Sequence, residues 1–474
     1  MPSFALGLLV NQPPQYQNQY TLVNKNGRLR FAAVSRRVLA LPNEILGEIF
    51  VYCLREPEPD GHPFGVLSKL DPNDAPLVLC AVCRRWRDIA LTTPGLWGSF
   101  SIQQTSVLSD SGADYVEFCR TWLSRAGITP VSIEFEAWIE HKRVLSLLEV
   151  IGGLAQRWQR AWLTFDPDLL KALRLPEAGK FPFLEQLALG TSFSELSLSF
   201  CDAPRLRDVY LVESTPQIRL PWHQLTSYET CTVLVPHFLQ ILGDAPNLVD
   251  ARFGIGGTFL PPSLPSIVIP LLHLQVLKLG NSDDDFLPMT ILNCLKAPAL
   301  EDLTLSFHGA QAFNANALPF LSFVSRSSFR LHILALSLMP GSTEGLIECL
   351  KATPTVADLK LRVRLGTNVN DVLAPFTGRS DNFLPKLESF HFVFSNQGVL
   401  VTTETASLVI DMLCWRWSMV GSTQLRSFNL DHEYFGLGNS LKSHPEYRRL
   451  RREGMLLYVE PGGYHYRHAD SFML

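Results

Sequence analysis

Three short runs of the sequence contain residue types that could bind a metal, a nucleotide or a redox partner. Cys80 and Cys83 have the Cys-x-x-Cys spacing of zinc and redox sites, His465 and His468 lie three residues apart, and residues 254–257 are GIGG. Each run lacks further residues that its chemistry needs: a second Cys/His pair, clustered ligands, or a helix with an acidic ribose partner. We therefore expect a structural role for the cysteines, a solvated tail around the histidines and a loop at 254–257.

The common catalytic signatures are also missing from the chain. It has no Walker A loop, no G-x-S-x-G elbow and no H-E-x-x-H helix. We predict a protein that is not an enzyme and that uses no cofactor and no metal.

Composition favours a protein of a reducing compartment. The 474 residues carry a net charge of −4 and nine thinly spread cysteines, an odd number that is typical of reduced thiols. A protein that coats nucleic acid would normally carry a basic excess. No run of about 20 apolar residues could span a membrane, and the first residues lack the basic segment of a signal peptide. We expect a cytoplasmic or nuclear protein that binds neither nucleic acid nor a membrane.

Two arginine-rich runs raise the question of an anion-binding surface. In VCRRWRDIA, residues 82–90, the arginines lie mainly off the apolar face of one predicted helix that also turns Cys83 towards the core. The run YRRLRREG at 447–454 could serve nuclear import or phosphate binding. We favour a solvated terminal helix for the second run and a docking helix with a charged rim for the first.

A proline–anchor–aspartate pattern recurs four times in the second half of the chain. Each copy has a proline, an apolar anchor two residues later, an aspartate two residues after the anchor, and an apolar-x-apolar strand core. The anchors are Leu206, Leu248, Leu300 and Val356, and the aspartates are Asp208, Asp250, Asp302 and Asp358. Weaker copies have their anchors at Leu184, Leu225, Leu274, Leu331, Leu387 and Leu425.

The L-x-x-L-x-L pattern, with anchors 19 to 38 residues apart, resembles the leucine-rich repeat, without its usual asparagine ladder. One such unit cannot bury its own apolar side, so the units must stack and share one core. The fold class that we predict is therefore α/β. It consists of a small helical domain followed by a leucine-rich-repeat-like solenoid with a curved parallel sheet.

The four aspartates are candidates for a substrate-binding face, and two interpretations remain open. With a weaker repeat between each pair, they lie two strands apart, roughly 10 Å, and could form an acidic ladder for a basic partner. Alternatively, each aspartate bonds the local turn at the start of its strand, which is the interpretation that we favour.

Two short apolar segments near the N-terminal end are separated by a stretch rich in proline and glycine. LPNEILGEIF, residues 41–50, begins with a Leu-Pro pair that suits the first turn of a helix. VCRRW at 82–86 and PGLW at 94–97 follow the breaker-rich residues 55–76. The order of these elements resembles the F-box, and an F-box before a repeat array resembles the large F-box families of fungi.

This resemblance implies a substrate-recognition subunit of an SCF-type cullin–RING ubiquitin ligase. The F-box would dock on the Skp adaptor, and through it on cullin and the RING subunit, while the repeat domain captures a protein substrate. The residues implied in adaptor binding or in the F-box core are Leu41, Pro42, Ile45, Leu46, Ile49, Phe50, Val82, Cys83, Trp86 and Trp97. Leu41 and Pro42 are the first candidates for direct contact, because they begin the first helix. The alternative is a protein-interaction scaffold that acts outside a ubiquitin ligase.

The expected domain organisation follows from these patterns. Residues 1–38 form a poorly ordered tail, and residues 39–102 form the F-box with an insertion at 55–76. Residues 103–460 form the solenoid, and residues 461–474 form a second tail.

Overall fold

The computed structural model describes most of the chain, in fourteen stretches. These are residues 40–54, 73–103, 112–175, 180–190, 197–256, 267–281, 289–306, 317–338, 343–363, 368–378, 383–394, 404–419, 424–432 and 436–461. The predicted N-terminal tail, nearly all of the predicted C-terminal tail with its two histidines, and most of the insertion at 55–76 lie outside these stretches. Two compact units divide the chain, one up to Leu206 apart from Ser194–Leu198, and one from Arg207 onwards with that short segment.

The architecture is mixed α/β with a long parallel sheet, as predicted. Fourteen strands follow one another in the order β1-β2-β3-β4-β6-β8-β9-β11-β13-β14-β15-β16-β17-β18. Strand numbers rise steadily along this order, as expected when each repeat stacks on the one before it.

The first unit begins with a helical region and continues into four parallel strands. Its helices are α3 (Asn43–Val51), α4 (Leu77–Val82), α5 (Arg84–Thr92), α7 (Gly112–Arg125), α8 (Lys142–Gly153) and α9 (Leu170–Leu173). Its 3-10 turns are η1 (Pro94–Trp97), η2 (Ala155–Arg157) and η3 (Pro167–Leu169). Its strands are β1 (Ser99–Gln103), β2 (Val131–Ala137), β3 (Trp158–Phe165) and β4 (Gln186–Leu189).

The second unit is built around ten parallel strands. They are β6 (Asp208–Ser214), β8 (Ser227–Leu234), β9 (Asp250–Gly256), β11 (Val276–Asn281), β13 (Asp302–Ser306), β14 (Ile333–Leu338), β15 (Asp358–Val363), β16 (Ser389–Phe394), β17 (Ser427–His432) and β18 (Leu456–Pro461). Short strands make two further pairs, β5 (Leu198–Ser199) with β7 (Ile218–Arg219) and β10 (Ile269–Pro270) with β12 (Leu295–Lys296).

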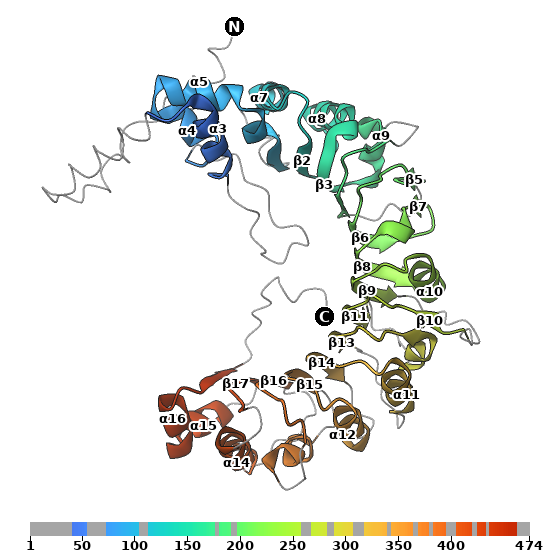
Figure 1. Cartoon of the computed structure of the whole chain (residues 1–474), viewed down its shortest axis with the longest axis vertical. Helices are drawn as coiled ribbons and strands as arrows, with labels where there is room; N and C mark the ends of the chain where they lie inside the picture. Colours follow the sequence, from blue (N-terminus) through green and yellow to red (C-terminus); the bar gives the residue numbers. More distant parts are fainter. Residues whose placement is uncertain are drawn as a thin grey trace, which may run out of the picture. The chain divides into compact units, whose positions relative to one another are not determined.

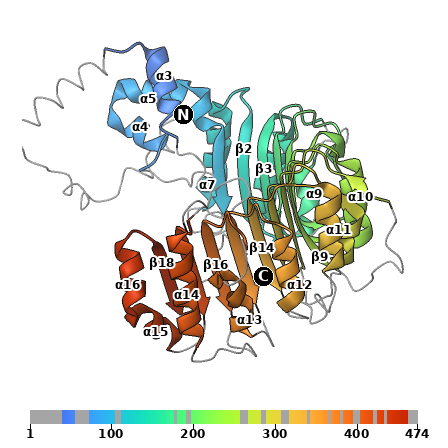
Figure 2. The same cartoon turned by 60° about the horizontal axis from the view of Figure 1, so that its bottom comes forward.

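Helices of the second unit cover one face of its sheet. They are α10 (Val235–Asp244), α11 (Leu318–Ser327), α12 (Thr343–Lys351), α13 (Val369–Leu373), α14 (Thr405–Ser418), α15 (Leu437–Ser443) and α16 (Pro445–Arg452), with turns η4 (Trp222–Gln224), η5 (Met289–Cys294) and η6 (Ala374–Thr377). Within this unit the strands follow a curve, and α10, α11, α12 and α14 lie on its outer side (Figures 1 and 2). We call the other side, which these helices leave uncovered, the open face.

All ten predicted anchors are buried, and each lies two residues before the first residue of a strand. The anchors Leu184, Leu206, Leu225, Leu248, Leu274, Leu300, Leu331, Val356, Leu387 and Leu425 are at most 1% exposed. The strand residues that follow them in alternation, such as Leu303 and Leu305 of β13, are also buried, beneath the helices. The repeat pattern therefore fixes both the core and the starts of the strands.

The proline of the repeat has a local structural cause. In the copy at 297–300, Pro298 occupies the second position of a β-turn, and the Leu300 N–H donates to the Ala297 carbonyl at 3.4 Å. The copies ending at Leu206, Leu248 and Val356 make the same bond at 3.1, 3.4 and 3.3 Å. Proline favours that turn position because its ring fixes φ, so it aims the anchor at the core.

Two predictions about local structure are wrong. Within the run at 254–257, Gly254, Ile255 and Gly256 form the end of β9 and not a loop, and Gly257 lies outside the described stretches. A side chain at Gly254 would overlap the carbonyl of Cys231 on β8, so glycine permits the close approach of the two strands there. The basic run at 447–454 does form a helix with exposed arginines, α16, but it is not the terminal element, because β18 follows it.

None of the helices in the described stretches is both long and apolar enough to cross a membrane.

A buried arginine hydrogen-bonds three backbone carbonyls near the C-terminal end of the second unit. Arg416 of α14 is 3% exposed and donates to three backbone carbonyls, those of Phe376, Phe383 and Leu384, at 3.3, 2.6 and 2.9 Å. Burial lowers the pKa of Arg416 to about 10, so the group still carries its charge at neutral pH. It thereby ties α14 to η6 and to the turn before β16.

We predict that Arg416→Met lowers the free energy of unfolding by about 3 kcal/mol, because three buried carbonyls lose their donors. Urea unfolding of the full chain measures the change. Arg426→Met is the control, since Arg426 makes a solvent-exposed ion pair with Glu388 at 3.6 Å, and its loss changes the free energy of unfolding by less than about 1 kcal/mol. Equal effects of the two substitutions would contradict the assignment.

A buried histidine makes stability depend on pH. His237 of α10 packs against Trp222, and burial lowers the pKa of His237 while the nearby Gln240 and Asp244 oppose the shift. The unfolded chain takes up a proton near pH 6.5, whereas the folded His237 stays neutral to a lower pH. Its contribution to stability is therefore present above about pH 6.5 and is lost as the pH falls.

We predict that His237→Leu makes the melting temperature fall less steeply than in the wild type between pH 7 and pH 5. Thermal melts across that range measure the slope. The matched control is His223→Leu, because His223 is exposed on η4 and should leave the slope unchanged.

Candidate functional site

The helices α3, α4 and α5 and the turn η1 enclose a small apolar core. Leu46, Phe50, Ile89, Leu96 and Trp97 are at most 5% exposed. The Trp97 indole donates to the Ala90 carbonyl at 2.8 Å, and the ring of Trp86 lies 4.8 Å from that of Phe50. Of the predicted residues, Leu46, Phe50, Trp86 and Trp97 thus pack inside this region.

The remaining apolar residues of the first helix face solvent. Ile45 is 48% exposed and Ile49 is 41% exposed, and Tyr52 just beyond the helix is 87% exposed. The spacing 45, 49 and 52 places them in one stripe along α3. On α4, Val78 and Val82 are also exposed, four residues apart. We call these five residues the apolar stripe; Tyr52 and Val78 were not among the predicted site residues.

The prediction for Val82 and Cys83 needs correction. The helix does not run through them: α4 ends at Val82, Cys83 has an extended backbone, and α5 begins at Arg84. Cys83 is half-buried and does not lie inside a helix; its thiol caps α5 by accepting the Trp86 N–H at 3.5 Å. Val82 therefore belongs to the exposed side of α4 and does not share a face with Trp86.

Two of the arginines have structural roles, and Arg87 donates to the Cys80 carbonyl of α4 at 2.8 Å. Arg85 donates to the Asn43 side chain at 2.9 and 3.0 Å and to the Leu41 carbonyl at 2.5 Å. It holds the Leu41–Pro42 start of α3 against α5. Leu41 is half-buried there and Pro42 is exposed.

The comparison with protein families identifies this region. Residues 38–103 match a family model described as F-box-like. The match covers the helices α3, α4 and α5, η1 and the first strand. An F-box-like region followed by a leucine-rich-repeat-like sheet is typical of non-catalytic adaptor proteins that bind other proteins, and no enzymatic family is indicated.

Comparisons beyond the F-box-like region add little. No curated protein matches the chain. Among solved structures, the crystal structure of the leucine-rich repeat-containing protein LegL7 from Legionella pneumophila is similar, with a TM-score of 0.31 and 12% sequence identity over 65% of this chain and 92% of that chain. The leucine-rich-repeat-like character of the sheet rests on its own register and buried anchors.

The four predicted aspartates lie in one row across the open face. The register aligns Asp208 with Ser227 and Asp250, then Asp250 with Val276 and Asp302, and finally Asp302 with Ile333 and Asp358. They are two strands apart, about 10 Å. We call this line of residues, at the first position of each strand, the aspartate row.

A second row, two residues further along each strand, carries basic side chains that the sequence analysis missed. It contains Arg252, Lys278, Lys360 and His391, each four residues after its anchor. A search for charge at that fixed offset from the anchors would have found them. We call this line the basic row.

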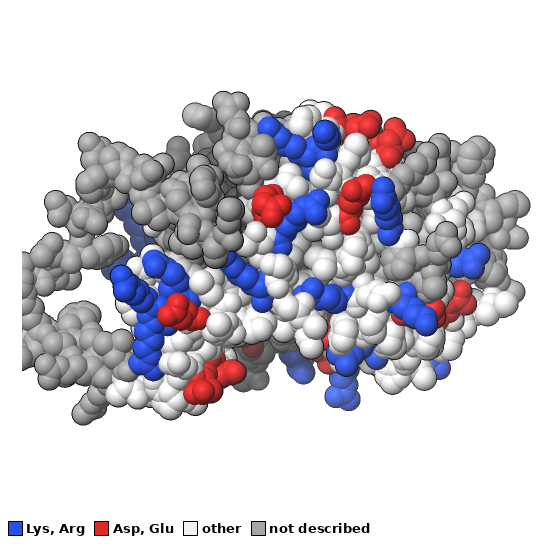
Figure 3. Space-filling view, turned by 90° about the horizontal axis from the view of Figure 1, so that it is seen from above, with Lys and Arg blue, Asp and Glu red and all other residues white. Residues whose placement is uncertain are grey.

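The two rows interact, so the open face is not uniformly acidic. Arg252 pairs with Asp250 of its own strand, at 3.0 and 2.8 Å, and reaches Glu229 at 3.6 Å. Further along the open face, His391 lies 2.9 Å from Asp431 of β17. The hydrogen bond between them is the largest cause of the lowered pKa of Asp431. Figure 3 shows Lys and Arg interspersed with Asp and Glu on the surface that it displays.

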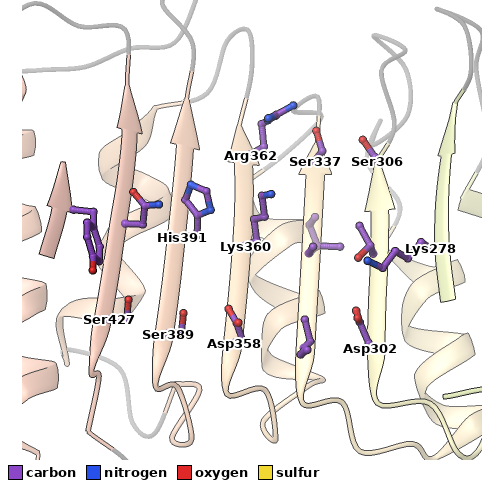
Figure 4. Close-up of a pocket in the computed structure, with 16 residues that line it drawn as sticks. Lys278, Asp302, Ser306, Ser337, Asp358, Lys360, Arg362, Ser389, His391 and Ser427 are labelled. Carbon is purple, nitrogen blue, oxygen red and sulfur yellow. The ribbon is translucent and has the colours of Figure 1, made fainter. Parts of the chain in front are cut away.

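A hollow of about 440 Å³ lies on the open face over β11 and β13 to β18. Three cations, Lys278, Lys360 and Arg362, and two carboxylates, Asp302 and Asp358, contribute to its lining, while Ser389, Ser427, Asn429 and Tyr458 line its other end. Figure 4 shows Asp302 and Asp358 at one edge and Lys360, Arg362, Ser306 and Ser337 further along the strands.

Within the described stretches, no group of three or more His, Cys, Asp or Glu side chains could hold a metal ion. Burial raises the pKa of Cys80, which keeps its thiol protonated and unreactive.

We predict that Leu46→Ala and Ile45→Ala change the free energy of unfolding by different amounts, because Leu46 lies in the core of the F-box-like region and Ile45 on its surface. Leu46→Ala should lower the free energy of unfolding by about 2–5 kcal/mol, because it leaves a cavity in the core. Ile45→Ala should lower it by less than about 1 kcal/mol. Urea unfolding followed by tryptophan fluorescence, to which Trp86 and Trp97 contribute, measures both. A large loss for Ile45→Ala would contradict its placement on the surface.

Proposed function

We propose that this protein is a substrate receptor of an SCF-type cullin–RING ubiquitin ligase. Its F-box-like region docks on the Skp adaptor, and its open face captures the protein that is to be marked for degradation. Catalytic groups on other subunits transfer the ubiquitin, and the complex acts in the cytoplasm or nucleus.

The observation that carries the proposal is the apolar stripe on the F-box-like helices. A single soluble chain gains nothing from holding Ile45, Ile49 and Val82 in water, since burying each would be worth roughly 1.5–3 kcal/mol. Such a stripe on a small helical region is typical of a surface that another protein covers. The F-box-like family match supports the adaptor as the protein that covers this stripe.

The residues divide between two roles under this proposal. Ile45, Ile49 and Val82, with Pro42, contact the adaptor, and Tyr52 and Val78 extend the same surface. Leu46, Phe50, Trp86 and Trp97 support it from inside, and Cys83 and Arg85 fix the starts of α5 and α3.

We predict that Ile45→Asp with Ile49→Asp abolishes capture of the Skp adaptor and shifts the melting temperature by no more than a few degrees. The charges would be buried unpaired in the interface, which costs several kcal/mol per residue. Co-purification of tagged protein with the adaptor measures capture.

The matched control is Leu272→Asp, which places the same charge on an apolar residue that is 57% exposed outside the F-box-like region. It should leave adaptor capture intact. Absence of the adaptor from the wild-type sample would refute the proposal itself.

Recovery of cullin decides between a ligase subunit and a scaffold that uses the adaptor elsewhere. Cullin in the wild-type sample, and its loss together with the adaptor in the Ile45→Asp, Ile49→Asp variant, is the expected result. Adaptor without cullin would favour the scaffold.

A further inference from the structure

We propose that the open face over β11, β13, β14 and β15 holds an oxyanion site, which receives a negatively charged group carried by the captured protein. This inference rests on the proposed role of the open face as the surface that binds a protein. It names the chemistry by which that surface selects its partner.

Small side chains form the floor of the site. In the basic row, Thr304 and Ala335 lie between Lys278 and Lys360, one on each successive strand. Two residues further along, the register places Ser306 and Ser337 beside Arg362. Because the two lysines are three strands apart, about 14 Å, the small residues leave room between them for a ligand group.

Cations stand on both sides of this floor. Lys278 of β11 borders one side, and Lys360 and Arg362 of β15 border the other (Figure 4). All three are half-buried in the lining of the hollow. Half-burial weakens the screening of their charges by water and salt, which strengthens their attraction for an anion.

Two polar atoms of the site are buried and have no hydrogen-bond partner within the described stretches. The Ser337 hydroxyl and one carboxylate oxygen of Asp302 are buried, and neither has a hydrogen-bond partner among the residues that the structure describes. Buried polar atoms normally have such a partner. The hydroxyl is a donor for an oxyanion, and the carboxylate is an acceptor for a basic or amide group next to it.

The charges of the hollow favour an anion over the basic partner that an aspartate ladder alone would select. Three cations outnumber the two carboxylates in its lining, and Asp250, the next member of the aspartate row, is already neutralised by Arg252. Asp302 and Asp358 then have a second role. They repel an anion from the strand starts and confine it between the lysines, with any positive group of the partner on their side.

The test measures binding of labelled peptides to the full chain by fluorescence anisotropy. A hexaglutamate peptide and a hexalysine peptide of equal length are compared at low and at physiological ionic strength. We expect the wild type to bind hexaglutamate in preference to hexalysine. Lys278→Ala with Lys360→Ala should weaken hexaglutamate binding at least about tenfold, which corresponds to about 1.4 kcal/mol.

Two further variants separate a built site from diffuse attraction. Ser337→Ala changes no charge, and it should weaken hexaglutamate binding at least about threefold if the hydroxyl contacts the oxyanion. Lys351→Ala removes a cation from the end of α12, outside the lining of the hollow, and should leave binding unchanged. Competition by free O-phosphoserine against free glutamate shows whether the oxyanion is a phosphoryl group or a carboxylate.

Several results would overturn the oxyanion site. These are no hexaglutamate binding, tighter binding of hexalysine that Asp302→Asn with Asp358→Asn abolishes, no effect of Ser337→Ala, or equal effects of Lys351→Ala and the lysine pair. The assay contains no adaptor, so such a failure is distinct from a failure of the F-box-like region to capture the Skp adaptor.

Discussion

A backbone hydrogen-bond pattern at the start of eight strands of the second unit holds the repeats in register. The N–H groups of two consecutive residues donate to one carbonyl of the preceding repeat: Glu301 and Asp302 to Gln275, and Ala357 and Asp358 to His332, all at 2.9–3.0 Å. The same arrangement recurs at β8, β9, β11, β14, β16 and β17. Backbone groups supply this bond whatever the side chains are, so the stacking tolerates repeats of very different length and lacks any need for an asparagine ladder.

The fixed register explains how irregular repeats produce ordered rows of charge. Because the ten strands with a predicted anchor each begin two residues after it, a residue's offset from the anchor decides its row, and the intervening loop length has no influence. Aspartate two residues after the anchor and lysine or arginine four residues after it therefore meet across strands that lie far apart in the sequence. The hollow between Lys278 and Lys360 exists because the two intervening repeats have Thr304 and Ala335 at that same offset.

The sequence predicted the parts of the structure that depend on one repeated constraint. The anchors, the strand starts, the two-strand spacing of the aspartates and the apolar character of α3 all follow from periodicity and burial. It failed where neighbouring segments override a local pattern. Apolar spacing predicted one helix through Val82 and Trp86, whereas α4 ends at Val82, the backbone is extended at Cys83, and Val82 is exposed. The run at 254–257 was predicted as a loop, whereas its first three residues belong to β9 and Gly254 is needed where β9 approaches Cys231. The partners of Arg85 and Arg416 were invisible because their carbonyls become neighbours only in the folded chain.

The two candidate surfaces use opposite physical means, which fits two different tasks. Binding through the apolar stripe of the F-box-like helices is stabilised by every side chain that the partner covers. Because this contribution is not directional, the partner needs only a complementary shape, which suits an adaptor that is always the same. The open face gains little from burial, because its rows are charged and must exchange water for partner groups of matching sign and position. Charge matching contributes mainly to discrimination between partners and to the rate of association. A substrate receptor needs that discrimination only on its variable side, so residues at the second and fourth positions after the anchors can change selectivity without disturbing either the core or the docking helices.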